Sequence, residues 1–300
     1  MGQLYIGTCS WTEKTLIESG KFYPPGVRTP EERLLFYASR FPVVEMDDTF
    51  YTLLSQQVSE WWARCAPPGF LFHVSAFGLL AGSLMPVHSL PMGLRDVLSG
   101  RLHAKGQVYL HDLPQTVQMG VWGLFREALQ PLQRAGKLGL VLFQFADSLM
   151  PGLDSQAYIL FCKAQLPHVR IGVEFRNGLW LDEGHMERTL KFLQEHGFVL
   201  VCVDEPQGFT TSVPPVAEAT SDQAYVRFHG RNREKWERKG GAPWERFDYF
   251  YRKEELQEWV PKLKALQDKA QATHVIFGAR HQDQGIANAC QLEALLNILP

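Results

Sequence analysis

Four short stretches of the chain place two polar side chains two residues apart, where an apolar run ends. The pairs are Glu45 and Asp47, His73 and Ser75, Glu174 and Arg176, and Arg227 and His229. Alternate side chains of a β-strand point to the same side, so each pair is expected to face one cavity. In such a cavity carboxylates and imidazoles can transfer protons, and guanidinium groups can bind phosphate or carboxylate. These residue types therefore predict a ligand site.

Two kinds of role follow from the chemistry of the candidate side chains. Proton transfer or stabilisation of charge is expected of Glu174, Glu45, His229, His73 and Asp204. Ligand binding is expected of Arg176, Arg227, Arg231, Asp47, Trp11, Tyr51, Trp180 and Gln144. The arginines would grip an anion through two N–H groups, and the aromatic rings would stack on a sugar or a base. We expect a small polar ligand that bears phosphate or carboxylate and can be sugar-like.

Hydrolysis and isomerisation are the two reactions that suit this set of side chains. Hydrolysis of a glycosidic bond needs one protonated and one ionised carboxyl group, and Glu174 with Glu45 or Asp204 forms the candidate pair. A divalent metal would find oxygen and imidazole ligands here, but two arginines in the same ring would repel it. A metal cofactor is therefore not favoured, and the sequence alone leaves the reaction open.

Two further functions compete with a small-molecule site. Residues 229–252 carry basic side chains interleaved with Trp236 and Trp244, a mixture that can follow a nucleic-acid backbone and stack on a base. The chain would then be a nucleic-acid-binding or nuclease-like protein. Alternatively, the charged pairs form a ring of structural salt bridges, and the protein is a non-catalytic scaffold.

Eight short apolar runs are predicted to be the strands that position these residues. They cover residues 4–7, 43–47, 70–75, 138–145, 170–175, 198–204, 224–229 and 274–277. Helical patterns separate most of them; near residue 30, for example, Thr29 and Glu32 form a capping box with Pro30 at the first helical position. Strands separated by helices pair in parallel, so eight such units predict an α/β fold, the (β/α)8 TIM-like barrel.

The barrel is expected to form a single domain over residues 1–300, with two departures from the ideal arrangement. Residues 76–116 form a long excursion after the third strand, an insertion or lid. Residues 205–222, after the sixth strand, carry only a weak helical pattern. In a barrel of this kind the carboxyl ends of all strands open on one mouth, which is where ligands bind.

Composition and charge place the chain among ordinary globular proteins. It has 300 residues, of which 45% are hydrophobic, and a formal net charge of -2, so no whole-chain field attracts nucleic acid or membrane. Five scattered cysteines without a C-x-x-C pair argue against a disulfide framework. No secretory signal and no membrane-spanning apolar run is visible, and a cytoplasmic location is predicted.

Seven motifs, in order along the chain, resemble those of one known family. They are YIGTCSW, FYPPG, VVEMDDTFY, VLFQF, VEFRNGLW, YVRFHGR and NACQLEALL. The sequence resembles the DUF72 family, also called the YecE-like family, from about Leu4 to Leu296. The resemblance implies a TIM-barrel-like fold and no settled activity. The chain departs from the family pattern at Ser75, where a Lys is usual, and at Gly278 and Ala279, where two Asn are usual.

Overall fold

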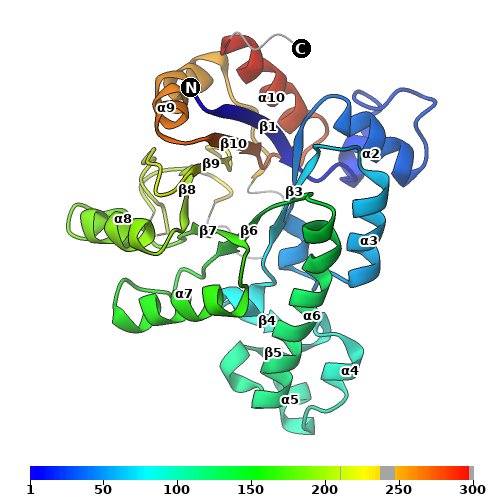
Figure 1. The fold of residues 1–300 in the computed structure, drawn as a ribbon, viewed down its shortest axis with the longest axis vertical. Coiled ribbons are helices and arrows are strands. Elements are labelled where there is room, and N and C mark those ends of the chain that lie inside the picture. Colours follow the sequence, from blue (N-terminus) through cyan, green and yellow to red (C-terminus); the bar gives the residue numbers. More distant parts are fainter. Residues whose placement is uncertain (210, 237–246, 297–300) are drawn as a thin grey trace.

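Eight parallel strands form a closed barrel in the structure, a computed structural model that describes residues 1–209, 211–236 and 247–296, without the side chain of Arg101. The strands are β1 (Gln3–Cys9), β2 (Val43–Met46), β3 (Leu71–Ser75), β6 (Leu138–Gln144), β7 (Arg170–Glu174), β8 (Val199–Asp204), β9 (Gln223–Phe228) and β10 (Ala272–Phe277). Strand β1 pairs with both β2 and β10, which closes the barrel (Figure 1). The predicted (β/α)8 TIM-like barrel is confirmed, and all eight predicted runs are barrel strands.

Helices lie between most of the barrel strands and cover the outside of the barrel (Figure 1). They are α1 (Lys14–Ser19), α2 (Pro30–Ala38), α3 (Gln56–Cys65), α6 (Gln115–Arg134), α7 (Leu153–Gln165), α8 (Met186–Glu195), α9 (Lys253–Lys269) and α10 (Gln284–Leu295). The capping box of Thr29 and Glu32 forms at the start of α2 as predicted, with Pro30 as its first residue. Between β8 and β9, residues 205–209 and 211–222 form no helix.

The excursion after β3 builds a small unit of short elements beside α6 (Figure 1). These elements are η2 (Gly78–Ala81), β4 (Met85–Pro86), η3 (Val87–Ser89), α4 (Met92–Arg95), α5 (Gly100–Lys105), β5 (Gln107–Val108) and η4 (Leu110–Asp112). The backbone N–H of Ala146, just beyond β6, donates to Ala81, and α4 packs against α6 where Gly120 leaves room for Leu94. Its role as a lid, and the single-domain organisation of residues 1–300, stay predictions.

The strand register determines which side chains fill the barrel and which face the helices. Arg227 pairs with Ile276 on one side and with Val203 on the other, and Glu174 pairs with Gln144. These positions point inward, so polar residues occupy the interior near the carboxyl ends of the strands. Large apolar residues occupy the outer faces, where Phe228, for example, packs against Trp259 of α9.

No described helix combines the length and the apolar character that crossing a membrane requires.

Candidate functional site

Arg227 lies at the centre of a buried polar cluster inside the carboxyl end of the barrel. Its Nη1 donates to Glu174 Oε2 at 2.5 Å and to Gln144 Oε1 at 3.1 Å. Its Nη2 lies 2.8 Å from Glu45 Oε1. Since Arg227 belongs to β9 and its partners to β2, β6 and β7, one guanidinium group joins side chains from four strands. All but Gln144 are buried, and Glu45 is fully enclosed.

Glu174 lies against two arginines and one histidine. Besides Arg227, it accepts a hydrogen bond from His229 Nε2 at 3.0 Å and lies 3.4 Å from Arg176 Nη1. Burial alone would favour the protonated form, but Arg227, His229 and Arg176 hold the pKa of Glu174 well below its usual range. Burial also lowers the pKa of His229 to about 4, so its imidazole is neutral at pH 7. Glu174 is therefore an ionised carboxylate throughout the physiological range.

Glu45 has fewer partners and the opposite protonation behaviour. Tyr225 OH donates to Glu45 Oε2 at 2.7 Å, and Arg227 supplies its only described ion pair. Burial raises the pKa of Glu45 to about 7, against the opposing effect of Arg227 and with the help of Asp47. Two carboxyl groups on the same guanidinium thus differ in protonation near neutral pH, the condition for a general acid beside a base or charge stabiliser.

Glu205, which the sequence reasoning missed, extends the cluster on the far side of Arg176. Its Oε2 accepts from Arg176 Nη1 at 2.8 Å, and its Oε1 accepts from the Val213 backbone N–H at 2.7 Å. Burial raises the pKa of Glu205 to about 7, although Arg176 opposes this. The ring of Trp236 lies 4.8 Å from the Arg176 guanidinium carbon and covers it. Glu205 follows Val203 by two residues, and Val203 faces inward as the register partner of Arg227. This i, i+2 spacing is the signal in the sequence that places Glu205 on the inner side.

Three buried polar atoms at this mouth lack hydrogen-bond partners among the described residues. They are Arg227 Nε, Glu45 Oε1 and Asp47 Oδ1. The 2.8 Å contact of Glu45 Oε1 with Arg227 is an ion pair without the alignment of a hydrogen bond. Buried polar groups are nearly always paired in proteins, so each of these atoms points to a ligand or to water.

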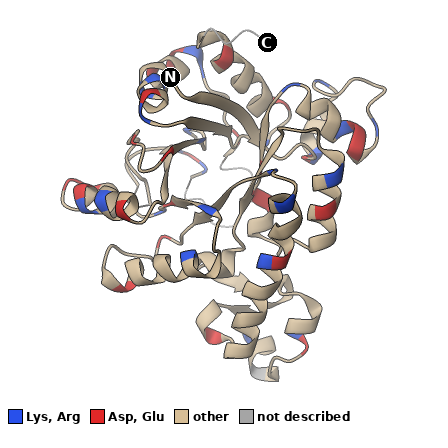
Figure 2. Cartoon of the chain, viewed as in Figure 1, with Lys and Arg blue, Asp and Glu red and all other residues tan. Residues whose placement is uncertain are grey.

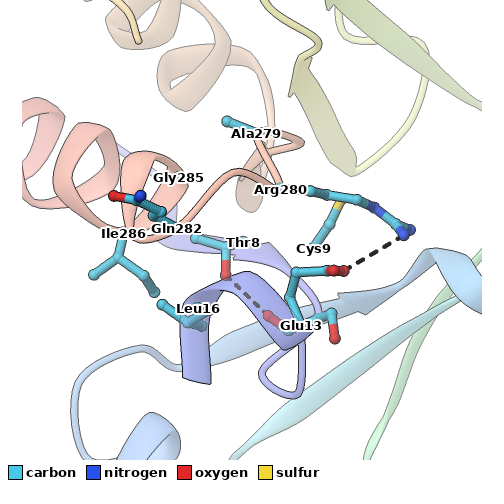
Figure 3. Close-up of a pocket in the computed structure, with 10 residues that line it drawn as sticks. Thr8, Cys9, Glu13, Leu16, Ala279, Arg280, Gln282, Gly285 and Ile286 are labelled. Carbon is cyan, nitrogen blue, oxygen red and sulfur yellow. Dashed lines mark hydrogen bonds and ion pairs between the residues drawn. The ribbon is translucent and has the colours of Figure 1, made fainter. Parts of the chain in front are cut away.

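A second group of charges lies on the β1 and β10 side of the mouth. Arg280 Nε donates to Asp47 Oδ2 at 3.0 Å, its Nη1 donates to Asp48 Oδ1 at 2.9 Å, and Glu13 lies 3.7 Å away. Figure 3 shows Arg280, Glu13 and Cys9 around a small pocket beside the first turn of α10. Burial, Asp47 and Glu45 raise the pKa of the Cys9 thiol well above its usual value, so Cys9 is not an activated nucleophile.

The family with the description "Protein of unknown function DUF72" matches residues 5–299. The chain belongs to the DUF72 family.

Relatives of this DUF72 protein match it over nearly its whole length. UPF0759 protein YunF of Bacillus subtilis (strain 168) is 30% identical over 299 residues, which cover 98% of this chain and 95% of that protein. The crystal structure of a DUF72 family protein from Enterococcus faecalis V583 superposes with a TM-score of 0.77 at 24% identity, covering 99% and 97% of the two chains. A DUF72 family protein from Thermotoga maritima gives 0.74 at 26% identity, covering 98% and 99%.

Two expected site residues of the DUF72 chain lie outside the barrel wall. Asp204 pairs in register with Phe228, so it faces the helices rather than the interior. It accepts from Trp259 Nε1 at 2.6 Å, and Arg231 binds it through two N–H groups at 2.9 and 2.7 Å. Arg231 also reaches Glu258 at 2.8 Å on the outer surface. The structure therefore does not bring Asp204 and Arg231 to the mouth, because β8 turns its other face inward.

His73 lies inside the barrel but below the mouth. Its Nε2 is 3.2 Å from His274 Nδ1, and its Nδ1 accepts from the Leu140 backbone N–H at 2.9 Å. Burial and His274 lower the pKa of His73 well below its usual value. His73 thus belongs to an internal neutral layer, and no hydrogen bond or ion pair is described between it and Glu45, Glu174 or Arg227.

Of the three aromatic residues expected to stack on a ligand, Trp11 and Trp180 are packed in the core, and Tyr51 lies on the surface. Trp11 is buried against Trp62 and Phe72, and Trp180 stacks on Phe175 at 4.3 Å with its Nε1 bound to a backbone carbonyl. Their burial leaves no ring face for a ligand. Tyr51 is 45% exposed at the end of η1 (Asp47–Phe50).

The positions expected to depart from the family pattern lie at or near the mouth. A Cβ atom added at Gly278 would lie 3.3 Å from the Phe228 carbonyl oxygen and 3.7 Å from His229 Nδ1, so the backbone at Gly278 packs closely beside this ring. Ser75 is buried on β3 and Ala279 lines the small pocket of Figure 3. Within the described residues, no three His, Cys, Asp or Glu side chains gather as a metal ion would require. The Trp244 part of the 229–252 segment lies outside the described residues.

Proposed function

We propose that this DUF72 protein binds a small, hydroxyl-rich, sugar-like molecule at the carboxyl-end mouth of the barrel and transfers protons to and from it. Glu45, whose pKa is raised to about 7, would exchange a proton with the ligand, Glu174 would be the ionised charge stabiliser, and Arg227 would hold both in place. Gln144, Arg176 and His229 would complete the lining.

The unpaired atoms of the central ion pair carry this proposal. Among the described residues, Arg227 Nε is a buried donor without an acceptor, and Glu45 Oε1 is a buried acceptor without an aligned donor. A hydroxyl group is both a donor and an acceptor, so one hydroxyl-bearing ligand can satisfy both kinds of atom. A phosphate group offers acceptors almost exclusively and would meet Glu45 and Glu174 with like charge.

The pairing of the mouth arginines also favours a hydroxyl-rich ligand over the anion expected from the sequence. Arg227 is bound to two glutamates, Arg176 to Glu174 and Glu205, and Arg280 to Asp47. An anion would have to displace a carboxylate from a buried guanidinium group to bind there. Such displacement leaves a buried charge unpaired, which is strongly unfavourable.

Thermal denaturation in the presence of neutral monosaccharides and polyols tests the proposed function. A ligand that binds only the folded state raises Tm as its concentration rises. We expect at least one neutral pentose, hexose or polyol to raise the Tm of the wild-type protein and of the control Glu258→Gln, whose carboxylate lies outside the barrel. The same compound should have little effect on Glu45→Gln or Glu174→Gln. Inorganic phosphate should leave Tm unchanged.

Two results would contradict the proposed function. One is a panel in which no neutral compound stabilises the wild-type protein. The other is stabilisation by phosphate that disappears in Arg176→Gln, which would restore the anion site.

A further inference from the structure

The buried mouth network has one more carboxylate than it has cationic groups. Glu45, Glu174 and Glu205 contribute three carboxyl groups, and only Arg176 and Arg227 lie among them. His229 adds no charge at neutral pH. Within the described residues this enclosed network is therefore one positive charge short of neutrality.

Among the described residues, the surrounding elements do not supply the missing charge. On the β1, β2 and β10 side, Asp47, Asp48 and Glu13 all lie on Arg280, so acid is in excess there too. From β3, His73 is a neutral neighbour of the layer below. Asp204 and Arg231 pair with each other outside the wall. The described residues of the mouth thus contribute a negative potential.

The positions of the arginines decide what kind of cation fits. Arg227 lies between Glu45 and Glu174, and Arg176 lies between Glu174 and Glu205, so the carboxylates cannot converge on one metal ion. An ammonium group is a compact cation that donates three hydrogen bonds in adjustable directions. Two buried acceptors, Glu45 Oε1 on β2 and Asp47 Oδ1 at the start of η1, have no hydrogen-bond donor among the described residues.

We infer that the ligand of the mouth carries one primary ammonium group next to its hydroxyl groups, as amino sugars and amino polyols do. The ammonium group binds Glu45 Oε1 and Asp47 Oδ1 and supplies the missing positive charge, while a neighbouring hydroxyl accepts from Arg227 Nε. The inference rests on the proposed function and names its ligand class. Without ligand, a proton bound to Glu45 or Glu205 supplies the missing positive charge. Binding of the ammonium group releases this proton.

Calorimetric titration with glucosamine and with glucose, which share a ring and differ in one charged group, tests the inference. We expect glucosamine to bind the wild-type protein roughly tenfold or more tightly than glucose, since a buried charge pair is worth at least this much. Glu45→Gln and, as a second variant against misfolding, Asp47→Asn should remove the preference. The control Glu258→Gln changes net charge equally and should keep it. Titration in buffers of different ionisation enthalpy should detect proton release with glucosamine alone.

The outcomes separate this inference from the proposed function. Equal binding of both sugars, abolished in Glu45→Gln, would overturn the ammonium group and leave the hydroxyl-binding site intact. If Glu258→Gln also lost the preference for glucosamine over glucose, the preference would come from general charge attraction, and the inference would be overturned. Binding of neither sugar, nor of any other neutral or amino sugar, would overturn both.

Discussion

A buried carboxylate requires cationic or hydrogen-bonding partners, and Arg227 supplies them to two glutamates at once. Its guanidinium group bonds Glu174 and lies against Glu45, all of them enclosed. Removing one partner of a buried ion pair leaves an uncompensated charge, which is far more destabilising than losing an exposed pair. Arg227 is therefore expected to stabilise the fold in addition to contacting a ligand.

Arg227→Met tests this dependence at the level of one residue. We expect the free energy of unfolding to fall by about 3–5 kcal/mol in urea denaturation. The control Arg188→Met, on the exposed face of α8, should change it by less than about 0.5 kcal/mol. In the Glu174→Gln background the loss caused by Arg227→Met should shrink, because one buried negative charge is gone. A stability of Arg227→Met equal to wild type would show that the network contributes nothing.

The histidine layer below the mouth has a defined protonation pattern. Because the Leu140 N–H donates to His73 Nδ1, the proton of this ring is on Nε2, which donates to His274 Nδ1. His274 must then donate through Nε2 to Gln223 Oε1, at 3.0 Å. Burial, with Arg170, lowers the pKa of His274 to about 3 from its ordinary 6.5. Protonating either ring would break this chain of hydrogen bonds.

Acid should therefore destabilise the protein through these histidines. Above pH 6.5 both rings are neutral in the folded and unfolded states. Below it, the unfolded chain takes up protons that the folded chain refuses, so stability falls by up to roughly 1.4 kcal/mol per pH unit for each histidine. His274→Gln keeps a donor and an acceptor, and we expect a shallower fall between pH 6.5 and 5 in urea denaturation.

The exposed residue His103 provides the control for this pH dependence. His103→Gln should show the wild-type slope. Comparing variants at each pH cancels the opposite effect of Glu45 and Glu205, whose raised pKa values remove stability as pH rises toward 7. Identical slopes for wild type and His274→Gln would show that the histidine layer titrates normally.

At the scale of single elements, the sequence identified strand ends more accurately than strand faces. The i, i+2 pairs at the ends of β7 and β9 alternate with apolar residues, and Glu174, Arg176, Arg227 and His229 do meet. Strand β8 is apolar on both faces, as buried parallel strands are, so its sequence contains no alternation that fixes a phase. The sequence therefore indicates Asp204, at the end of the apolar run, whereas in the structure Glu205, one residue further, joins the cluster and Asp204 faces the helices.

Close approach of β1 and β2 depends on Gly7. A Cβ atom added there would lie 2.2 Å from the carbonyl oxygen of Val43, its register partner. The carbonyl oxygen is backbone, and the next atom, Val43 Cγ1 at 2.9 Å, belongs to a stiff β-branched side chain. Neither atom can move aside, so the two strands would have to separate. We expect Gly7→Ala to lower the free energy of unfolding by about 3 kcal/mol or more.

A matched glycine in a helix distinguishes strand separation from a general effect of alanine. Gly123 of α6 has open space where its Cβ would be, so Gly123→Ala should raise stability by about 0.5–1 kcal/mol in the same urea experiment. If Gly7→Ala unfolded at the same urea concentration as the wild-type protein, the close approach of β1 and β2 would be contradicted.

For the whole molecule, the number and order of apolar runs were sufficient to predict the barrel. Each run is short, bounded by polar segments and separated from the next by a helix or a long connection, which parallel pairing requires. The depth at which each side chain lies inside the barrel could not be predicted in this way, because it depends on strand tilt and stagger that no local pattern encodes. His73 and Glu45 are register partners on adjacent strands, yet one belongs to the histidine layer and the other to the mouth cluster.

The charge distribution of the whole molecule argues against nucleic-acid binding. The net charge is -2, and in Figure 2 acidic and basic positions are interspersed on outer helices such as α8. In the described part of residues 229–252, Arg231 is bound to Asp204, Lys235 to Asp248, and Trp236 is buried. Arg233 is exposed and donates to the Gln207 carbonyl oxygen at 2.7 Å, while Arg238, Lys239 and Arg246 lie outside the described residues.

We therefore expect no gel shift of single- or double-stranded oligonucleotides even at low salt, where contacts to phosphate are strongest. Each phosphate contact releases counterions, so a true backbone-binding surface would give a shift that weakens steeply as salt rises. Observing such a shift, together with its loss in Lys239→Ala and its retention in Lys191→Ala on α8, would assign nucleic-acid binding to residues 229–252. Absence of a shift would argue against nucleic-acid binding by residues 229–252 and would agree with the ligand site proposed inside the barrel.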